Sequence, residues 1–423
     1  MSASTAAGAA RRRYFRVLLA AAIGAWGLFL AGTVIYNRDK DFSRGFEAET
    51  LPDYVVFYSA GRLVLDGRGD ELYDLDAMGR EESEVAGVAV EGEDVLPYFN
   101  PPFLAALFAP LTLLPLEGFA LLLTAVNLAL LLASGVWLQR LLSPRDEGGK
   151  AAFWLAYALS YPVLGLFINL QVTLLVAVAL LAFVHFQERR REGLAGGALA
   201  LALVKPQFAV LPALFLLYNR RWAALLPLAA VAGGLVLVSA AVSGPAVLVD
   251  YPRFLTETTR WAGNGVFGEN MYGWQGLLAD LTGDATPPRP LFLGLALPTL
   301  AVAWWRMRRP WPQTAGALPG VMAVALLGTL LAAPHLYAHD LLLVTLAVLF
   351  AGVQAVREGV SLGPWWAAAL GFWLLGMARL AGLEAPLPSA AMVVLFAALI
   401  WRGAPGVGRR RDAGLRLSPA KAG

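Results

Sequence analysis

The sequence is dominated by apolar runs that are long enough to cross a lipid bilayer. A transmembrane helix needs about 20 predominantly apolar residues. Of the 423 residues, 58% are hydrophobic and 15% are charged, whereas a soluble domain carries about 25% charged residues. Suitable runs lie at 15–35, 117–139, 151–168, 170–186, 222–243, 290–305, 315–333, 339–355, 364–382 and 386–401. The chain is therefore predicted to be an all-α polytopic membrane protein.

One further apolar stretch, 193–218, is interrupted at Lys205-Pro206-Gln207. Proline removes a backbone donor and bends a helix, so this stretch predicts two half-length helices in a broken hairpin. The total is about 12 membrane helices, which places both termini on the same side. The run 103–114, bounded by prolines, is too short to span and predicts an interfacial or re-entrant helix.

The distribution of charge orients these helices. Segment 36–97 carries 6 Lys/Arg against 16 Asp/Glu, while the N-terminus and the short loops on the other side are rich in Lys/Arg. The positive-inside rule then predicts cytoplasmic termini in a plasma or inner membrane. A single domain, 1–423, is expected, with external active-site loops at 36–102 and 244–289 that contain interfacial helices, and a cytoplasmic basic tail at 403–423. Arg11-Arg12-Arg13 before the first apolar run could begin a cleavable signal peptide, but no convincing small-residue cleavage site follows, so an uncleaved first span is expected.

Composition also excludes some classes of site and partner. The chain has no cysteine, so it can form neither a disulfide nor a thiolate metal site. Its formal net charge is +3 and no basic patch with interleaved aromatic residues is present, so no nucleic-acid partner is expected.

Asp53 is the leading candidate for chemistry. It follows the first predicted span at the membrane–water boundary and is surrounded by aromatic residues. Partial burial there would raise its pKa, which suits a general base. The alternative is an ordinary aspartate at the start of a short helix. Tyr98 and Asn100, beside Pro101-Pro102, offer hydrogen bonds to a substrate, or belong to a rigid turn without a chemical role.

Lys205 lies within an apolar stretch, where an unpaired ammonium costs several kcal/mol. A lipid phosphate is its natural partner; the alternative is that it reaches the membrane surface. His335 and His339 are spaced by four, which would place them on one helical face. No third metal ligand is evident and Asp340 would point elsewhere, so a polar contact to sugar or phosphate is favoured. Asp74-Leu75-Asp76 resembles a D-x-D motif, but there is no nucleotide-binding domain to support it.

An ordered set of motifs resembles glycosyltransferase family 87, whose members have the GT-C fold. The set runs through Asp53 and Tyr58-x-Ala60-Gly61, Leu72-Tyr73-Asp74, Tyr98-x-x-Pro101-Pro102-Phe103, Gln171, Lys205-Pro206-Gln207, Asn270 with Gly273, and Pro334-x-x-Tyr337-x-His339. It covers most of the chain. The sequence departs from the pattern at Ala333, where a serine is frequent, and in the acidic insert Glu81–Asp94, and both departures bear on the acceptor.

The resemblance implies transfer of a hexose, typically mannose, from a polyprenyl-phosphate donor to an envelope lipid or glycan acceptor at the outer face. No cofactor is expected, cationic residues can stabilise the leaving phosphate without a metal, and the need for a metal stays open. It implies that Asp53 is the catalytic base. Donor-phosphate candidates are Lys205, His339, Arg253, Arg260 and Arg379. Substrate-binding candidates are Tyr58, Tyr98, Asn100, Gln171, Asn270 and Tyr337.

Other readings stay open at this point. A transporter or flippase of a lipid-linked substrate is the main alternative, and a non-catalytic membrane scaffold is another. Within the transferase class, arabinofuranose or glucose could replace mannose, and the reaction could be inverting or retaining. The sequence does not specify the oligomeric state.

Overall fold

The fold was analysed in a computed structural model. It describes residues 51–142, 160–256, 271–284, 286–308, 315–360 and 387–402, together with Lys150, Phe153, Trp154, Tyr157, Ala158, Ala368 and Gly371. Several predicted features lie outside these residues: the run 15–35, the basic tail 403–423, and the candidates Arg260, Asn270 and Arg379. Of the predicted run 364–382, only Ala368 and Gly371 are described. Every regular element in the described ranges is a helix, as predicted.

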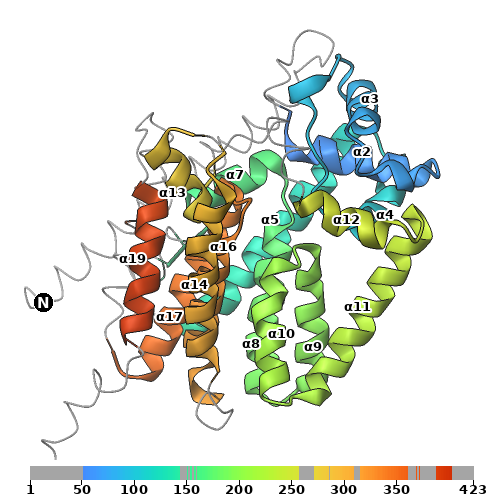
Figure 1. The fold of residues 1–423 in the computed structure, drawn as a ribbon. Helices are drawn as coiled ribbons and strands as arrows, with labels where there is room; N and C mark the ends of the chain where they lie inside the picture. Colours follow the sequence, from blue (N-terminus) through green and yellow to red (C-terminus); the bar gives the residue numbers. More distant parts are fainter. Residues whose placement is uncertain are drawn as a thin grey trace, which may run out of the picture.

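The apolar helices form two neighbouring groups (Figure 1). The first contains α14 (Arg289–Met307), α16 (Leu318–Ala332), α17 (Leu342–Arg357) and α19 (Leu387–Arg402). The second contains α8 (Thr173–Glu188), α9 (Glu192–Leu201), α10 (Gln207–Tyr218) and α11 (Trp222–Ser243), while α5 (Leu116–Leu142) packs against both α8 and α17. Within the described ranges, four helical segments have the length and composition of a membrane span: Leu116–Leu142, Trp222–Ser243, Arg289–Met307 and Ala338–Arg357.

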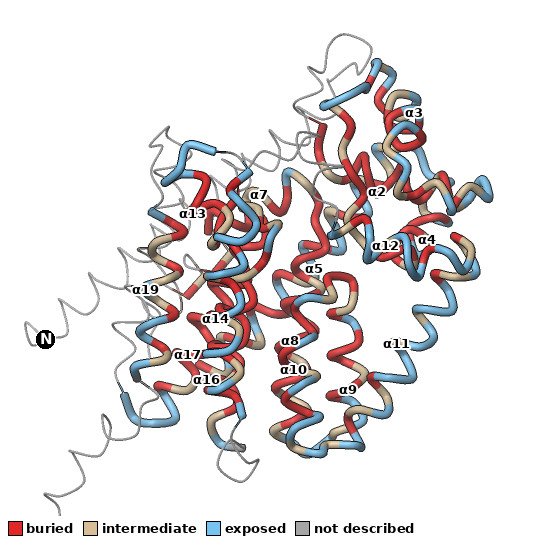
Figure 2. The backbone as a smooth tube through the Cα atoms, in the orientation of Figure 1, coloured by how far each residue is buried: buried red, intermediate tan, exposed pale blue. Residues whose placement is uncertain are grey.

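The burial pattern distinguishes the centre of the bundle from its periphery (Figure 2). The span that contains α17 is 89% buried, whereas the α11 span is 11% buried. Leu226 and Leu237 on α11 are 68% and 71% exposed. Large apolar faces left exposed on long apolar helices are what a lipid environment requires. The described helices therefore agree with a multi-pass membrane protein, while the number of twelve stays a prediction.

Two predicted features of the second group can be compared directly with the structure. The stretch 193–218 is a broken hairpin, as predicted: α9 and the 3-10 turn η5 (Ala202–Val204) end at Lys205, and α10 begins at Gln207. The predicted run 151–168 does not continue as one helix, because Ser160 is extended and α7 (Tyr161–Asn169) begins after it, with Pro162 in its first turn. Proline fits the first turn of a helix and not its interior, which explains the break.

A cap of shorter helices covers one end of the bundle (Figure 1). It contains α2 (Asp53–Leu65), η2 (Gly69–Glu71), α3 (Leu75–Ala86), η3 (Gly92–Asp94), α4 (Pro102–Phe108), η4 (Ala109–Leu113) and α12 (Val247–Thr256). The short helix predicted at 103–114 is thus α4 followed by η4. Near the first group, α13 (Gly273–Thr282) lies at the same end, and the short turn η8 (Ala315–Ala317) precedes α16.

Hydrogen bonds link three segments at this end of the bundle. The hydroxyls of Tyr161 and Tyr272 lie 3.0 Å apart, and the backbone N–H of Tyr272 donates to Leu336 O at 2.8 Å. These contacts connect α7, the segment before α13 and the loop after α16. They position the turn η9 (Ala338–Leu341), which precedes α17 and carries the candidate site.

Candidate functional site

Asp53 is the first residue of α2 and follows Pro52, whose backbone is extended. A carboxylate is stabilised in the first turn of a helix by the helix dipole. The backbone N–H of Asp53 donates to Asn169 Oδ1 at 3.4 Å, and Gln171 Nε2 donates to Asp53 Oδ2. Asn169 is the last residue of α7 and Gln171 lies two residues later. Between them, Leu170 adopts a left-handed backbone conformation that turns the chain. The sequence candidates Asp53 and Gln171 are therefore brought together.

The environment of Asp53 combines burial with access. Its side chain retains 31% exposure. Burial of the carboxyl raises the pKa of Asp53 from 3.8 to about 6, against the opposing effects of the Gln171 hydrogen bond and the nearby Lys205 charge. Within the described part of the chain, Oδ2 holds the Gln171 contact while Oδ1 has no hydrogen-bond partner. A carboxylate with one anchored and one accessible oxygen can accept a proton from an incoming hydroxyl.

His339 and Asp340 lie on the 3-10 turn η9. His339 Nδ1 is 3.9 Å from Asp53 Oδ2, and His339 Nε2 is 3.6 Å from Asp340 Oδ2. The imidazole of His339 thus lies between two carboxylates, one from the cap and one from the start of the α17 span. Its side chain is 8% exposed. This places the sequence candidate His339 beside Asp53.

Asp340 forms a buried ion pair with Lys205. Lys205 Nζ donates to Asp340 Oδ1 at 2.5 Å, and Thr173 Oγ1 donates to the same oxygen at 2.7 Å. The Lys205 and Asp340 side chains are 10% and 4% exposed. A buried charge of either sign needs a partner of opposite sign. From the sequence we considered Asp340 only as a third metal ligand on an α-helix; in the structure it lies in a 3-10 turn and pairs with Lys205.

A sequence signal for this pair did exist. Lys205 and Asp340 are ionisable residues of opposite sign that stand inside or at the edge of separate apolar runs. Such residues tend to pair with one another. The site residues that sequence reasoning missed are thus Asp340 and its hydroxyl partner Thr173.

The loop before η9 corrects the prediction for the two histidines. His335 lies in a non-helical loop and His339 in a 3-10 turn, so they do not share a helical face. His335 packs against Phe99, with ring centroids 4.3 Å apart, and against Tyr337 at 4.8 Å. Burial lowers the pKa of His335 to about 4. No group of three or more His, Asp or Glu in the described ranges is arranged to hold a metal ion.

Other candidates lie in the cap and are bound to its backbone. Tyr58 Oη donates to Leu114 O at 2.8 Å, and Tyr98 Oη donates to Pro101 O at 3.2 Å. The backbone carbonyl of Asn100 accepts from Tyr73 Oη at 2.8 Å. These bonds give Tyr58 and Tyr98 a packing role, which favours the rigid-turn alternative for the segment around Asn100.

Tyr337 and Arg253 belong to different parts of the structure. The rings of Tyr337 and His339 are 6.1 Å apart, which brings Tyr337 next to the Asp53 cluster. Arg253 lies on α12 and lines a separate cavity at the cap. Asp74 of the D-x-D-like motif caps α3, since its Oδ1 accepts from Ala77 N at 3.0 Å.

Comparison with known proteins identifies the family. The profile described as glycosyltransferase family 87 matches residues 98–334, a stretch that contains Gln171 and Lys205. A relative from Mycolicibacterium smegmatis (strain ATCC 700084 / mc(2)155) is 30% identical over 296 residues, which cover 67% of this chain and 69% of the relative. It is described as a polyprenol-phosphate-mannose-dependent alpha-(1-2)-phosphatidylinositol pentamannoside mannosyltransferase. No solved structure matches significantly. On the family match and this relative, the chain belongs to glycosyltransferase family 87.

Proposed function

We propose that this glycosyltransferase moves a mannosyl group from a polyprenyl-phosphate donor to a lipid-borne glycan, with Asp53 as the general base. The observation that carries the proposal is the continuous cluster Asp53–His339–Asp340–Lys205, which joins the cap to the bundle through contacts of 3.9, 3.6 and 2.5 Å. It places an accessible carboxylate next to a buried cation at the end of the bundle. The donor and the acceptor glycan are those in the name of the M. smegmatis relative.

Asp53 supplies the proton acceptor. The acceptor hydroxyl approaches Asp53 Oδ1, and its oxygen attacks the anomeric carbon of the donor sugar as its proton moves to the carboxylate. The new C–O bond forms while the bond from the anomeric carbon to the phosphate oxygen breaks, and polyprenyl phosphate leaves with the electron pair. A pKa near 6 keeps Asp53 ionised at neutral pH and closer to a hydroxyl in basicity than an ordinary aspartate.

In this proposal, Lys205 and His339 receive the leaving phosphate. An ammonium has three N–H donors, and one of those of Lys205 is used by Asp340. The remaining donors can bond phosphate oxygens without releasing Asp340. Because charge develops on the phosphate as the bond breaks, a fixed cation there stabilises the transition state. Arg260 and Arg379 stay further candidates for this role.

We place the cap and Asp53 on the outer face of the plasma or inner membrane, with both termini in the cytoplasm. The support is the charge distribution, because segment 36–97 has 6 Lys/Arg against 16 Asp/Glu and the opposite loops are basic. A lipid-linked donor suits this side, since soluble nucleotide sugars are cytoplasmic compounds and the described chain has no strand-based nucleotide-binding domain.

The test is mannose transfer by full-length protein in lipid nanodiscs, with radiolabelled polyprenyl-phosphate mannose and phosphatidylinositol mannosides as acceptors. Asp53→Asn should lower kcat by about 100-fold or more, since removal of a general base costs about 10²–10⁴ in rate. Asp66→Asn is the matched control, because Asp66 is an exposed aspartate that caps the opposite end of the same helix. Equal activity of wild type and Asp53→Asn would refute the role of Asp53. Translocation of the labelled lipid without any transfer would support the flippase alternative instead.

A further inference from the structure

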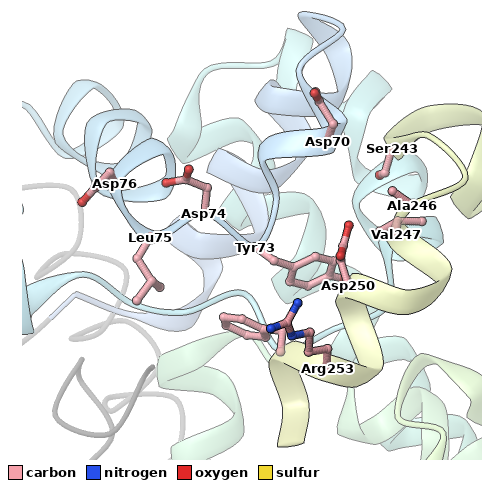
Figure 3. A pocket seen from close by; sticks show the side chains of 11 residues that line it. Asp70, Tyr73, Asp74, Leu75, Asp76, Ser243, Ala246, Val247, Asp250 and Arg253 are labelled. Carbon is pink, nitrogen blue, oxygen red and sulfur yellow. The ribbon is translucent and has the colours of Figure 1, made fainter. Parts of the chain in front are cut away.

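A cavity of about 540 Å³ lies in the cap, apart from the Asp53 cluster (Figure 3). Its volume is within the range of about 300–1,000 Å³ that is typical of small-molecule sites. Its walls come from η2, the start of α3, the end of α11 and α12. We propose that this cavity is a subsite for the glycan of the acceptor, away from the reacting sugar. This inference rests on the proposed function, because it takes the acceptor to be a glycan.

Ser243 provides the first reason to expect a ligand. Its side chain lines the cavity and the residue is 3% exposed, and within the described part of the chain its hydroxyl has no hydrogen-bond partner. A buried hydroxyl without a partner destabilises a protein by about 1–3 kcal/mol. Figure 3 shows Ser243 beside Ala246 and Val247, with Asp70 and Asp250 near it in this view. A ligand hydroxyl in the cavity would satisfy this group.

The chemistry of the other walls fits a hydroxyl-rich ligand. Carboxylates accept hydrogen bonds, whereas the Arg253 guanidinium donates them, and a sugar hydroxyl can do both. The partly exposed ring of Tyr73 adds apolar surface against which a sugar ring can pack. The four aspartates among the lining residues are Asp70, Asp74, Asp76 and Asp250.

The charge of the cavity excludes other ligands of the reaction. Four aspartates against one arginine give a negative lining, which repels the phosphate of the donor and the phosphate of a phospholipid headgroup. The carboxylates are also spread around the walls, and no described group of three or more is arranged to hold a metal. A neutral glycan is therefore the favoured ligand.

A row of rings connects the cavity to the catalytic cluster. Tyr73 packs on Phe254 with centroids 5.2 Å apart, Phe254 on Phe99 at 5.8 Å, and Phe99 on His335 at 4.3 Å. The row continues through Tyr337 to His339, which lies 3.9 Å from Asp53. This packing ties the cavity to the catalytic cluster, so that a glycan can have its reacting hydroxyl at Asp53 and more distant sugars in the cavity.

Gly69 brings two walls of the cavity together. A Cβ at this position would lie 2.1 Å from Val242 O and 3.2 Å from Ser243 Oγ. The backbone of η2 therefore approaches the end of α11 more closely than any side chain would permit. Asp70 follows Gly69 directly, so this contact holds the turn that carries Asp70 against the end of α11, which carries Ser243.

The experiment is calorimetric titration of full-length protein in nanodiscs with mannose and with a soluble α-linked mannose pentasaccharide. We expect the wild type to bind the pentasaccharide more tightly than mannose. Asp250→Asn and Ser243→Ala should weaken pentasaccharide binding by about tenfold, the factor that corresponds to 1.4 kcal/mol. Glu93→Gln is the matched control for lost charge, because Glu93 is an exposed carboxylate of the cap outside the cavity.

Ser243→Ala also separates binding from folding. Removal of an unpartnered buried hydroxyl should leave the melting temperature of the unliganded protein equal or higher, while the affinity for the pentasaccharide falls. A lower melting temperature with unchanged affinity would show a structural role and overturn the proposal. Preferential binding of a polyamine, spermine, at this cavity would also overturn it, in favour of a cationic ligand.

The two proposals fail in different ways. If wild-type protein transfers mannose but binds mannose and pentasaccharide equally, or the variants bind like wild type, the subsite is refuted and the proposed reaction stands. If wild-type protein binds the pentasaccharide and the variants do not, but no mannose is transferred from the polyprenyl-phosphate donor, the subsite stands and the proposed reaction is refuted.

Discussion

Lys205 Nζ lies 2.5 Å from Asp340 Oδ1, although the two residues are 135 positions apart in the sequence. Lys205 comes from the break in the hairpin between α9 and α10, and Asp340 from the turn before α17. The pair therefore connects the two groups of apolar helices close to the candidate catalytic base. This relationship leads to the first prediction.

Loss of one member of the pair should destabilise the protein more than loss of both. Lys205→Met leaves the Asp340 carboxylate buried without its cation, which costs about 3–5 kcal/mol in a buried pair. The double variant Lys205→Met/Asp340→Asn should recover part of that stability. Thermal unfolding of the purified protein in detergent measures this.

Glu84→Gln is the control for the pair, because the exposed Glu84 contacts Arg62 at 3.4 Å at the surface of the cap. Exposed pairs contribute about 0–1 kcal/mol. Additive effects of the two substitutions at Lys205 and Asp340 would contradict a coupling between them.

The pH dependence of transfer should report Asp53. A general base acts in its deprotonated form, so kcat/KM should fall as the pH drops below about 6, the raised pKa of Asp53. An aspartate with its usual pKa would place this fall near 4. The Gln171 hydrogen bond lowers the pKa of Asp53, so Gln171→Met should move the fall to higher pH. A profile of kcat/KM against pH that is the same for both proteins would contradict this assignment.

Glu82 should make the stability of the cap depend on pH. It is fully buried, its Oε2 accepts from Leu96 N at 3.1 Å, and burial raises its pKa from 4.5 to about 8. Between these values the folded protein binds more protons than the unfolded chain, so stability falls as the pH rises from about 4.5 to 8. Melting temperatures measured across this range should fall less in Glu82→Gln than in wild type. Glu93→Gln should behave like wild type, and an equal slope for Glu82→Gln would disprove the effect.

Two neighbouring glycines on α9 should respond in opposite ways to alanine. A Cβ at Gly196 would lie 1.9 Å from Ala224 O on α11, so Gly196→Ala forces the two helices apart and should cost about 1–3 kcal/mol. At Gly197 a Cβ would meet nothing within 4 Å. Gly197→Ala should be neutral or stabilising by up to about 1 kcal/mol, because alanine is the better helix former. Thermal unfolding of both variants compares them, and similar melting temperatures would argue against the close contact.

The local pattern of apolar residues and prolines in the sequence predicted much of the helical architecture. Apolar runs of the right length became α5, α11, α14 and the α17 span, and Lys205-Pro206 predicted the break in the hairpin. Such features depend on neighbouring residues, because hydrophobicity and proline act within a few turns of the chain. The interruption at Ser160-Tyr161-Pro162 had an equally local signal, which was given too little weight beside the apolar run around it.

For the site, sequence by itself determined which residue types were available: an aspartate at the boundary of the cap, a lysine in an apolar stretch, and a histidine followed by an aspartate before another span. Only the tertiary structure decided that Asp340 is the partner of Lys205 and that His339 lies between Asp340 and Asp53. The reason is that these contacts depend on which faces of distant helices meet and on the 3-10 turn at Ala338–Leu341. Helix packing sets both, and the local sequence pattern does not encode either.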